Sequence, residues 1–266
     1  MTKGWAVVTG ASSGIGLEFA WELTRRGHPV FAIARRRERL ETLAKEAAEH
    51  GGRIEFFSAD LATEEGLAVA LRRVDELGEI DLLINNAGVA TAGDFVGVSL
   101  DREIGEIRLN VEAVVKLTQH LLGPMVKRRH GAIINLASVV GFQPFPHFAV
   151  YAATKAFVIT FTEALAEEIK GTGVRILALC PGSVRTEIDV FAHNEGLLGK
   201  LPSLTAERVV KTGLRALENG RVVKVVGRLN QFLPLLSRFM PRQTMRWIMG
   251  MSVKPSGTQR TPKVVA

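Results

Sequence analysis

Trp5-Ala6-Val7-Val8-Thr9 is a short apolar run, and Gly10-Ala11-Ser12-Ser13-Gly14-Ile15-Gly16 follows it directly. The run is typical of a buried strand, and the residues after it, from about 14 to 26, have a helical pattern. Glycines let the backbone approach a pyrophosphate closely, and the N-terminus of a helix offers unpaired N–H groups to an anion. The segment therefore predicts a strand, a phosphate-binding turn and a helix, although its Gly-x-x-x-Gly-x-Gly spacing differs from the general dinucleotide fingerprint. The alternative is a tight loop that binds nothing.

The same alternation of strand-like and helix-like segments continues along the chain. Helix-like stretches cover about 14–26, 38–49, 64–77, 100–128, 151–170 and 204–219. Strands that alternate with helices form parallel sheets covered on both faces. We therefore expect a doubly wound α/β fold of the Rossmann type, with about seven parallel strands flanked by helices. The predicted strands are Trp5 to Thr9, Val30 to Ala34, Ile54 to Ser58, Leu82 to Asn85, Ala132 to Ala137, Val174 to Cys180 and Val222 to Val226.

The bulk composition is that of a globular protein, because 47% of the 266 residues are hydrophobic and 23% are charged,. Residues 1–250 are predicted to form one domain, since no repeat or linker divides them. The single cysteine cannot form an internal disulfide, and the N-terminus has no signal-peptide core, so we expect a cytoplasmic protein,. No stretch has the roughly 18 uninterrupted apolar residues that a membrane span requires.

The net charge of +7 favours an anionic partner, and the densest cationic patch is Arg35-Arg36-Arg37, after the second predicted strand,. In NAD-binding units an acidic residue at this place holds the adenosine ribose. Here no carboxylate is present, and arginine can grip a phosphate with two hydrogen bonds. Arg35 and Arg36 are therefore predicted to bind the 2′-phosphate of NADP, the alternative being that they only decorate an exposed helix. No aromatic residues are interleaved with the patch, so we expect no nucleic-acid partner.

Tyr151-Ala152-Ala153-Thr154-Lys155 opens a predicted helix, so Tyr151 and Lys155 lie at positions i and i+4 on one face,. A fixed ammonium beside a phenol favours the phenolate, so we expect the pKa of Tyr151 to be lowered towards the working pH. Such a pair can act as a general acid or base. Tyrosine and lysine occur four apart by chance on many surface helices, but Tyr151 is the only tyrosine of this chain.

Together these motifs resemble those of the short-chain dehydrogenase/reductase family, over about residues 4–226. The resemblance implies that Ser138 hydrogen-bonds the substrate oxygen, that Tyr151 exchanges its proton, and that Lys155 holds the nicotinamide ribose while tuning Tyr151. Asn110 matches the fourth catalytic member, which anchors a water in the proton relay. The matching motifs are Thr9-Gly10-x-x-x-Gly14-x-Gly16, Asn85-Asn86-Ala87-Gly88, Ser138 thirteen residues before Tyr151, Tyr151-x-x-x-Lys155 and Pro181-Gly182.

The resemblance also implies an NADP(H) cofactor and its contacts. Asp60 is expected at the adenine, and Asn86 and Gly88 are expected near the adenosine ribose. A purely structural role for the turn 85–88 is an equal alternative. The nicotinamide end is expected at Pro181, Gly182 and Thr186. The full set of expected cofactor contacts is Gly10, Ser12, Ser13, Gly14, Ile15, Gly16, Arg35, Arg36, Asp60, Leu61, Asn86, Ala87, Gly88, Tyr151, Lys155, Pro181, Gly182, Val184 and Thr186.

Some conspicuous residues have plainer interpretations. His147 and His193 have no third ligand at metal spacing, so we expect no metal site. Cys180 ends an apolar run and is predicted to be a small core residue. The loop before the tyrosine contains three aromatic residues that could line a pocket or pack in the core, namely Phe142, Phe145 and Phe148.

Two segments lie outside the alternation of strands and helices. Residues 187–203 follow the carboxyl end of a strand, where ligands bind in open α/β sheets, and are predicted to form a substrate lid. Residues 229–250 are apolar with scattered arginines, and as an amphipathic helix they could cover the pocket, an oligomer face or a membrane surface. The polar tail 251–266 is predicted to be disordered.

The sequence thus predicts an NADP-dependent oxidoreductase that transfers a hydride between nicotinamide and a carbonyl or secondary alcohol. The apolar loops 139–148 and 190–201 favour an apolar substrate. A catalytically idle NADP-binding sensor or scaffold on the same fold is the alternative. The helix from Tyr151 is apolar on more than one face, which predicts a dimer or tetramer, or a monomer if residues 229–250 cover that face. The family resemblance implies contacts through this helix and the one near 100–128.

Overall fold

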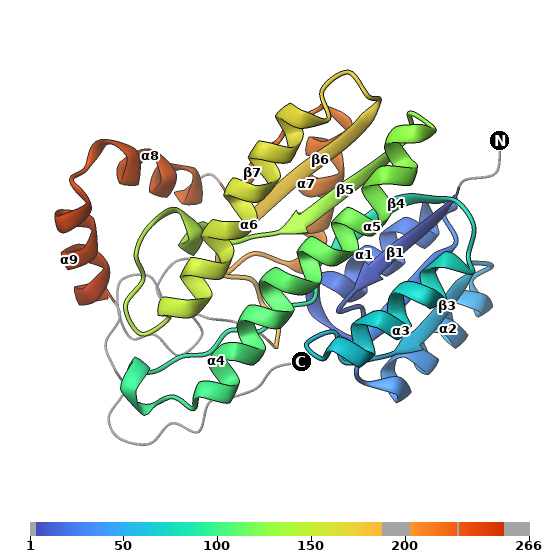
Figure 1. Cartoon of the computed structure of the whole chain (residues 1–266), viewed down its shortest axis with the longest axis horizontal. Helices are drawn as coiled ribbons and strands as arrows, with labels where there is room; N and C mark the ends of the chain where they lie inside the picture. Colours follow the sequence, from blue (N-terminus) through green and yellow to red (C-terminus); the bar gives the residue numbers. More distant parts are fainter. Residues whose placement is uncertain (1–3, 188–202, 228, 253–266) are drawn as a thin grey trace.

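The apolar run Trp5–Thr9 forms strand β1, which is buried along its whole length. In this computed structural model, which describes residues 4–187, 203–227 and 229–252, six further strands join it in the order β3-β2-β1-β4-β5-β6-β7 (Figure 1). All neighbouring strands are parallel, so the expected doubly wound sheet is confirmed. The added strands are β2 (Val30–Ala34), β3 (Ile54–Ser58), β4 (Ile80–Asn85), β5 (Gly131–Leu136), β6 (Val174–Pro181) and β7 (Val223–Val226).

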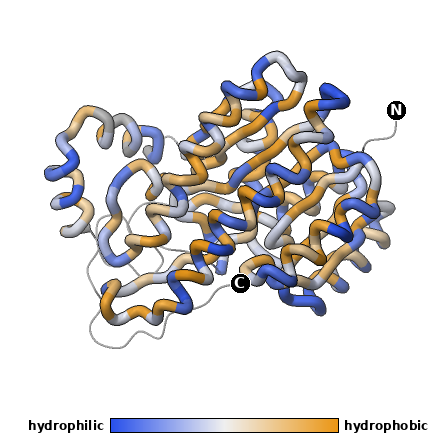
Figure 2. Tube along the Cα trace, viewed as in Figure 1, coloured by the Kyte–Doolittle hydropathy of each residue, from blue (hydrophilic) through white to orange (hydrophobic). Residues whose placement is uncertain are grey.

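Two layers of helices cover the sheet, because alternate strand residues point to opposite faces. Ala6 and Val8 of β1 join one apolar cluster, with α1 (Gly14–Arg25), α2 (Arg37–Glu49) and α7 (Ala206–Glu218). Trp5 and Val7 join the other, with α3 (Glu64–Asp75) and α5 (Ala113–Lys127), and α6 (Ala149–Glu168) packs on the same side against β6. The strands are the most continuously orange segments of Figure 2, as expected when both faces are buried,.

The predicted helix 100–128 is interrupted. It consists of α4 (Leu100–Ile107), a π-helical segment (Arg108–Glu112) and α5. Inside the π segment, the side chain of Asn110 bonds the backbone of Val89 on both its N–H and its C=O, at 3.0 and 2.9 Å. A π turn rotates the residues that follow it, and such turns are frequent at functional sites. Periodicity in the sequence does not reveal it.

One described helix, α6, has the length and composition of a membrane span, with a mean hydropathy of 1.2. In the structure α6 packs against β6, and its buried residues include Tyr151, Val158 and Ile159. The position of α6 explains its apolar composition. A helix that covers a parallel sheet and also contacts α4 needs apolar residues on more than one side,.

The C-terminal segment differs from the single amphipathic helix that was expected over 229–250. After a short 3-10 turn (Leu229–Gln231), it forms α8 (Phe232–Phe239) and α9 (Arg242–Ser252). Met240 between them is extended, with ψ 143°, because the following Pro241 disfavours the helical conformation at the residue before it,. Met251 and Ser252, placed in the predicted tail, belong to α9. The rest of that tail, and residues 188–202 of the predicted lid, lie outside the described residues.

The carboxyl ends of the strands form the edge of the sheet where a ligand is expected. The strand order reverses between β1 and β4, and ligands bind outside the carboxyl ends of the strands at such a point,. The turns after β1, β4, β5 and β6 all emerge there. Helices α8 and α9 extend beyond this end, at the left of Figure 1, and Met245 and Met249 are buried in one cluster with Phe145 and Phe148.

Candidate active site

The turn after β1 has the shape of a phosphate-binding turn. Gly10 has a φ of +68°, a conformation that favours glycine,. A Cβ atom at Gly16 would lie 2.3 Å from the carbonyl oxygen of Gly10 and 2.4 Å from the amide nitrogen of Asn86, so only glycine allows α1 to start this close. Helix α1 begins at Gly14 with its free N–H groups at this turn,. The backbone can therefore approach an anion closely, with the positive end of the helix dipole behind it.

Asn86 holds the turn in place. Its side-chain amide donates to the carbonyl of Thr9 at 2.9 Å and of Gly10 at 3.3 Å, while its own N–H donates to the hydroxyl of Thr9 at 3.0 Å. Asn85 points away from the cavity into a buried network, donating to Thr118 and Asn135 at 3.0 and 2.8 Å. Both side chains thus have the structural role that the sequence left open, and Asn86 also lines the cavity described below.

Arg36 lies over the phosphate-binding turn rather than out in solvent. Its guanidinium donates to the hydroxyl of Ser12 at 3.1 and 3.2 Å and to that of Ser13 at 2.7 Å. Arg35 lies beside Asp60, with a nitrogen–oxygen distance of 3.8 Å. Arg37 instead decorates an exposed helix, because its side chain is 69% exposed and pairs with Glu41 on α2. The first two arginines therefore surround the place where the adenosine part of a dinucleotide is expected.

A second group of side chains, Ser138, Tyr151 and Lys155, lines the cavity described below. Ser138 follows β5 and begins a 3-10 turn, while the other two lie on α6, one helical turn apart. All three are buried, with 6–8% of their surface exposed. Ser138 hydrogen-bonds the phenol of Tyr151. The Lys155 ammonium lies 5.7 Å from the centre of the tyrosine ring and donates to the carbonyl of Leu136 at 2.8 Å. A phenol, an aliphatic hydroxyl and an ammonium group thus lie close together.

Asn110 lies behind this group and not on the cavity wall. Besides Val89, its amide donates to the hydroxyl of Thr154 on α6 at 3.1 Å, and it is almost fully buried. It therefore ties the loop after β4 to the helix that carries Tyr151 and Lys155. Its side-chain oxygen would lie 3.0 Å, and the Lys155 nitrogen 3.5 Å, from a Cβ atom placed on Gly88. A side chain at Gly88 would therefore crowd Asn110.

The pKa values of Tyr151 and Lys155 differ from the sequence-based expectation. Burial raises the pKa of Tyr151 well above its ordinary value, and the hydrogen bond from Ser138 only partly opposes this. Burial also lowers the pKa of Lys155 to about 8, so its ammonium is less firmly charged than a surface lysine,. The expected lowering of the tyrosine pKa is therefore wrong, because desolvation dominates and the charge of Glu106 raises the pKa of Tyr151 further,.

Glu106 is a buried carboxyl that the sequence analysis missed. It lies on α4 with none of its surface exposed, and it accepts from the N–H of Thr91 at 2.9 Å. Its other oxygen lies 3.5 Å from the amide nitrogen of Asn110. Burial raises the pKa of Glu106 to about 7, and the charge of Lys155 lowers it only slightly. Its helix reads as amphipathic in the sequence, and only the packing of α4 against α6 shows that this glutamate faces inward.

Glu106 predicts a pH dependence of stability. A carboxyl with a folded pKa of about 7 and an unfolded pKa of 4.5 makes the folded state bind more protons between these values, so the free energy of unfolding falls as pH rises through this window,. Between pH 5 and 7 the loss is about 2 kcal/mol. We expect Glu106→Gln to abolish this part of the loss, measured by urea unfolding at both pH values. Exposed Glu41→Gln is the control, and an equal pH dependence in both variants would contradict the assignment.

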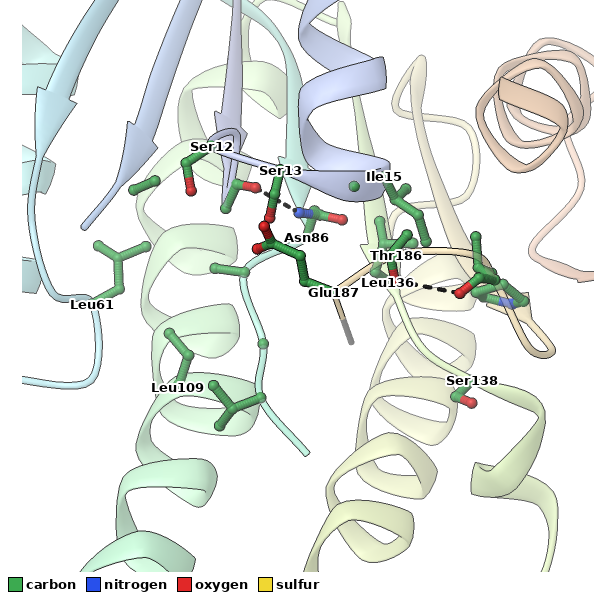
Figure 3. Close-up of a pocket in the computed structure, with 18 of the residues that line it drawn as sticks. Ser12, Ser13, Ile15, Leu61, Asn86, Leu109, Leu136, Ser138, Thr186 and Glu187 are labelled. Atoms are coloured by element: carbon green, nitrogen blue, oxygen red, sulfur yellow. Dashed lines mark hydrogen bonds between the residues drawn. The ribbon is translucent and has the colours of Figure 1, made fainter. Parts of the chain in front are cut away.

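The turn and the Ser138–Tyr151–Lys155 group line one continuous cavity, from Ser12 and Ser13 at one end to Ser138 at the other (Figure 3). Most expected cofactor contacts are on its wall. Gly16 and Arg36 are the exceptions, since Gly16 packs against the carbonyl of Gly10 and Arg36 bonds Ser12 and Ser13. Asn110, predicted as a catalytic residue, is not on the wall either. Additional wall residues that the sequence did not suggest include Ile33, Ala34, Ala59, Val89, Leu109, Leu136, Ala137, Ser183 and Glu187.

The remaining residues singled out in the sequence have structural positions. Phe145 and Phe148 are buried and lie edge to face, with ring centres 5.6 Å apart, and Phe142 packs against the cluster that contains Cys180. Packing is therefore the observed role of all three rings. His147 bonds Asp94 at 2.8 Å. His193 lies outside the described residues. Within the described ranges, no group of three metal-binding side chains gathers.

The fold and these side chains define a doubly wound α/β protein with a glycine-rich turn at one end of a cavity and a buried Ser–Tyr–Lys group at the other. Comparison with known proteins identifies the family: residues 4–195 match the model of the short chain dehydrogenases. A short chain dehydrogenase of Pseudocercospora fijiensis is 39% identical over 186 residues, 69% of this chain and 60% of the relative. The 17-beta-hydroxysteroid dehydrogenase type 3 of Mus musculus is 34% identical over 215 residues, 79% of this chain and 68% of the relative.

A solved structure extends the likeness over nearly the whole chain. The short-chain dehydrogenase from Sphingobium yanoikuyae, solved in complex with NADPH, has a TM-score of 0.79 and 30% identity, covering 97% of this chain and 99% of that one. The chain therefore belongs to the short-chain dehydrogenase family of oxidoreductases.

Proposed function

We propose that this protein is an NADP(H)-dependent oxidoreductase that interconverts a carbonyl and a secondary alcohol. One observation carries the proposal: a single cavity runs from Arg35 and the phosphate-binding turn, whose Ser12 and Ser13 bond Arg36, to the buried Ser138–Tyr151–Lys155 group. The NADPH bound by the Sphingobium relative supports the choice of cofactor. A carboxylate at the end of β2, where NAD enzymes hold the ribose, is absent from this sequence,.

The residues of the cavity have distinct proposed roles. NADP(H), when bound, supplies or accepts the hydride. The turn from Gly10 to Gly16 holds the pyrophosphate, and Arg35 and Arg36 hold the 2′-phosphate. Ser138 donates a hydrogen bond to the substrate oxygen, Tyr151 gives that oxygen its proton during reduction and takes it during oxidation, and Lys155 binds the nicotinamide ribose. Asp60 and Leu61 contact the adenine, Asn86 to Gly88 the ribose region, and Pro181, Gly182, Val184 and Thr186 the nicotinamide.

Lys155 also prepares Tyr151 for this role. Burial raises the pKa of Tyr151 and so keeps the phenol protonated, which suits the proton donor of a reduction. For oxidation the phenolate must form, and the nearby ammonium stabilises it. Asn110 positions Lys155 and Tyr151 indirectly, through its bonds to the loop after β4 and to Thr154.

An apolar ketone, aldehyde, steroid-like or acyl compound is the proposed substrate. Leu109, Val89 and Leu136 give the cavity an apolar wall, and the rodent relative is named for a hydroxysteroid,. A panel of carbonyls and alcohols, assayed by nicotinamide absorbance with each cofactor in turn, tests reaction, cofactor and substrate class together. Tight NADPH binding without turnover of any compound would favour the alternative, an idle NADP-binding sensor or scaffold. The complete set of Asn110, Ser138, Tyr151 and Lys155 argues against that alternative.

We propose that α4 and α6 form a subunit interface in a dimer or tetramer. Leu100, Ile104 and Ile107 on α4 and Phe157 on α6 remain 37–69% exposed, and the two helices contact each other. The C-terminal helices cover Tyr151 and the loop before it instead, so they leave this face open. A symmetric pairing of the face with its copy would bury these side chains.

We propose that the protein is cytoplasmic and that α8 and α9 make peripheral contact with a membrane. Their exposed side chains combine large apolar groups with arginine, the pattern of a helix that lies on an anionic lipid surface. Arg242 and Arg246 are exposed on α9. The apolar members, 44–77% exposed, are Phe232, Leu236, Phe239, Trp247 and Met251.

Two variants separate these surfaces. We expect light scattering to give at least twice 29.0 kDa at micromolar concentration, and Phe157→Asp to lower this mass, because it places a charge in the interface,. Trp247→Asp should leave the mass unchanged but reduce co-sedimentation with vesicles rich in anionic lipid. A mass near 29.0 kDa for the unmodified protein would refute the interface, and absence of vesicle binding would refute the membrane contact.

A further inference from the structure

A carboxylate occupies the cationic end of the cofactor cavity. Glu187, in the segment that follows β6, accepts from Arg36 at 2.6 Å with one oxygen and from Arg39 at 2.6 Å with the other. These hydrogen bonds lower the pKa of Glu187 to about 2, so it is ionised at any physiological pH. Its side chain lines the cavity and is directed towards Ser12 and Ser13 in Figure 3.

The groups around Glu187 form an anion-binding site. Arg36 bonds the carboxylate and both serine hydroxyls at once, and Arg39 adds a second guanidinium from the next turn of the chain. Guanidinium and hydroxyl donors are the groups that bind phosphate as well as carboxylate. The site also lies at the end of β2, where the 2′-phosphate of NADP is proposed to bind. A carboxylate and a phosphate repel each other and cannot share the same guanidinium nitrogens.

We propose that Glu187 competes with the 2′-phosphate of NADP(H) for Arg36 and Arg39, and so sets the affinity for NADP(H) relative to NAD(H). This inference rests on the proposed NADP-binding function. When NADP(H) binds, the phosphate replaces the carboxylate, and Glu187 moves into solvent. NAD(H) has only a hydroxyl at this position, so it leaves the Glu187 ion pairs intact. Arg39 becomes a further phosphate ligand beside Arg35 and Arg36, which their motif does not indicate.

The isosteric change Glu187→Gln tests the competition directly. It removes the negative charge but keeps the size of the side chain, so the dissociation constant for NADPH should fall about tenfold while that for NADH stays unchanged. Calorimetry on the full chain at pH 7 measures both without relying on turnover. Adenosine 2′,5′-bisphosphate should repeat the NADPH result, and adenosine 5′-monophosphate should repeat the NADH result.

Glu41→Gln is the matched control, because Glu41 pairs with Arg37 at 2.7 Å on the same helix and makes no bond to Arg36 or Arg39. It changes the net charge equally and should alter neither constant by more than about twofold. Arg39→Ala should weaken NADPH binding about tenfold in the Glu187→Gln background, where Arg39 no longer has the Glu187 carboxylate as a partner,.

Each outcome has one meaning. If the unmodified protein binds NADPH more tightly than NADH but Glu187→Gln changes neither constant, the competition is refuted and the proposed function stands. If Glu187→Gln weakens NADH binding, the carboxylate holds the adenosine ribose and the inference is wrong. If the unmodified protein shows no preference for NADPH, the proposed cofactor itself is wrong.

Discussion

Replacing Tyr151 with phenylalanine is expected to lower turnover by about 10²–10⁴-fold, the usual contribution of a general acid or base. The variant keeps the aromatic ring among Phe148, Ala152 and Met245 but loses the only exchangeable proton that the ring can offer. NADPH binding, measured by calorimetry, should change little, because the phenol carries no charge in the protein without ligand,.

Two further variants sharpen this test. Lys155→Ala should damage both turnover and NADPH binding, since Lys155 is proposed to contact the ribose as well as to stabilise the phenolate. Thr160→Val removes a hydroxyl from the exposed side of the same helix and should have no effect. Retained activity of Tyr151→Phe on any carbonyl that the unmodified protein reduces would refute the mechanism.

The double replacement of Arg35 and Arg36 by alanine should remove most of the preference for NADP(H). Each charge-assisted hydrogen bond to the 2′-phosphate contributes about 1.5–3 kcal/mol, so loss of two should raise the NADPH dissociation constant about 10²–10⁴-fold and change the NADH constant little. Arg37→Ala removes the same charge from the adjacent residue, which pairs with Glu41 away from the cavity, and serves as the control.

Competition binding with both cofactors measures this preference in one experiment. A double variant that keeps the full NADPH preference of the unmodified protein would show that Arg35 and Arg36 do not bind the 2′-phosphate. Equal affinities of the unmodified protein for the two cofactors would have the same meaning.

The fold and much of the candidate site follow from short sequence patterns, for physical reasons. Gly10, Gly14 and Gly16 act within one turn, and Tyr151 and Lys155 act within one helical turn, so the sequence places them together without tertiary information. Alternation of apolar runs and helices also indicates the parallel sheet, and each predicted strand agrees with the structure within two residues at either end.

Features that depend on distant segments could not be predicted. Glu187 and Arg39 are 148 residues apart, and neither belongs to a motif. Glu106 becomes buried only because α4 packs on α6, and the raised pKa of Tyr151 reflects the same burial rather than its neighbour at i+4. Pro241 indicates the break between α8 and α9, but no local pattern indicates that Met245 and Met249 pack against Phe145 and Phe148.

The chain contains one tyrosine, and it is the residue at the centre of the candidate site. Ultraviolet absorbance of tyrosinate in the unmodified protein therefore comes from Tyr151 alone, without labels or isotopes. The ionisation of the phenol can be followed as a spectral change in solution. Any change in its pKa when a cofactor binds can be followed in the same way. Tyr151→Phe supplies the blank. A protein with tyrosines elsewhere would hide this signal, so here the site itself serves as the chromophore.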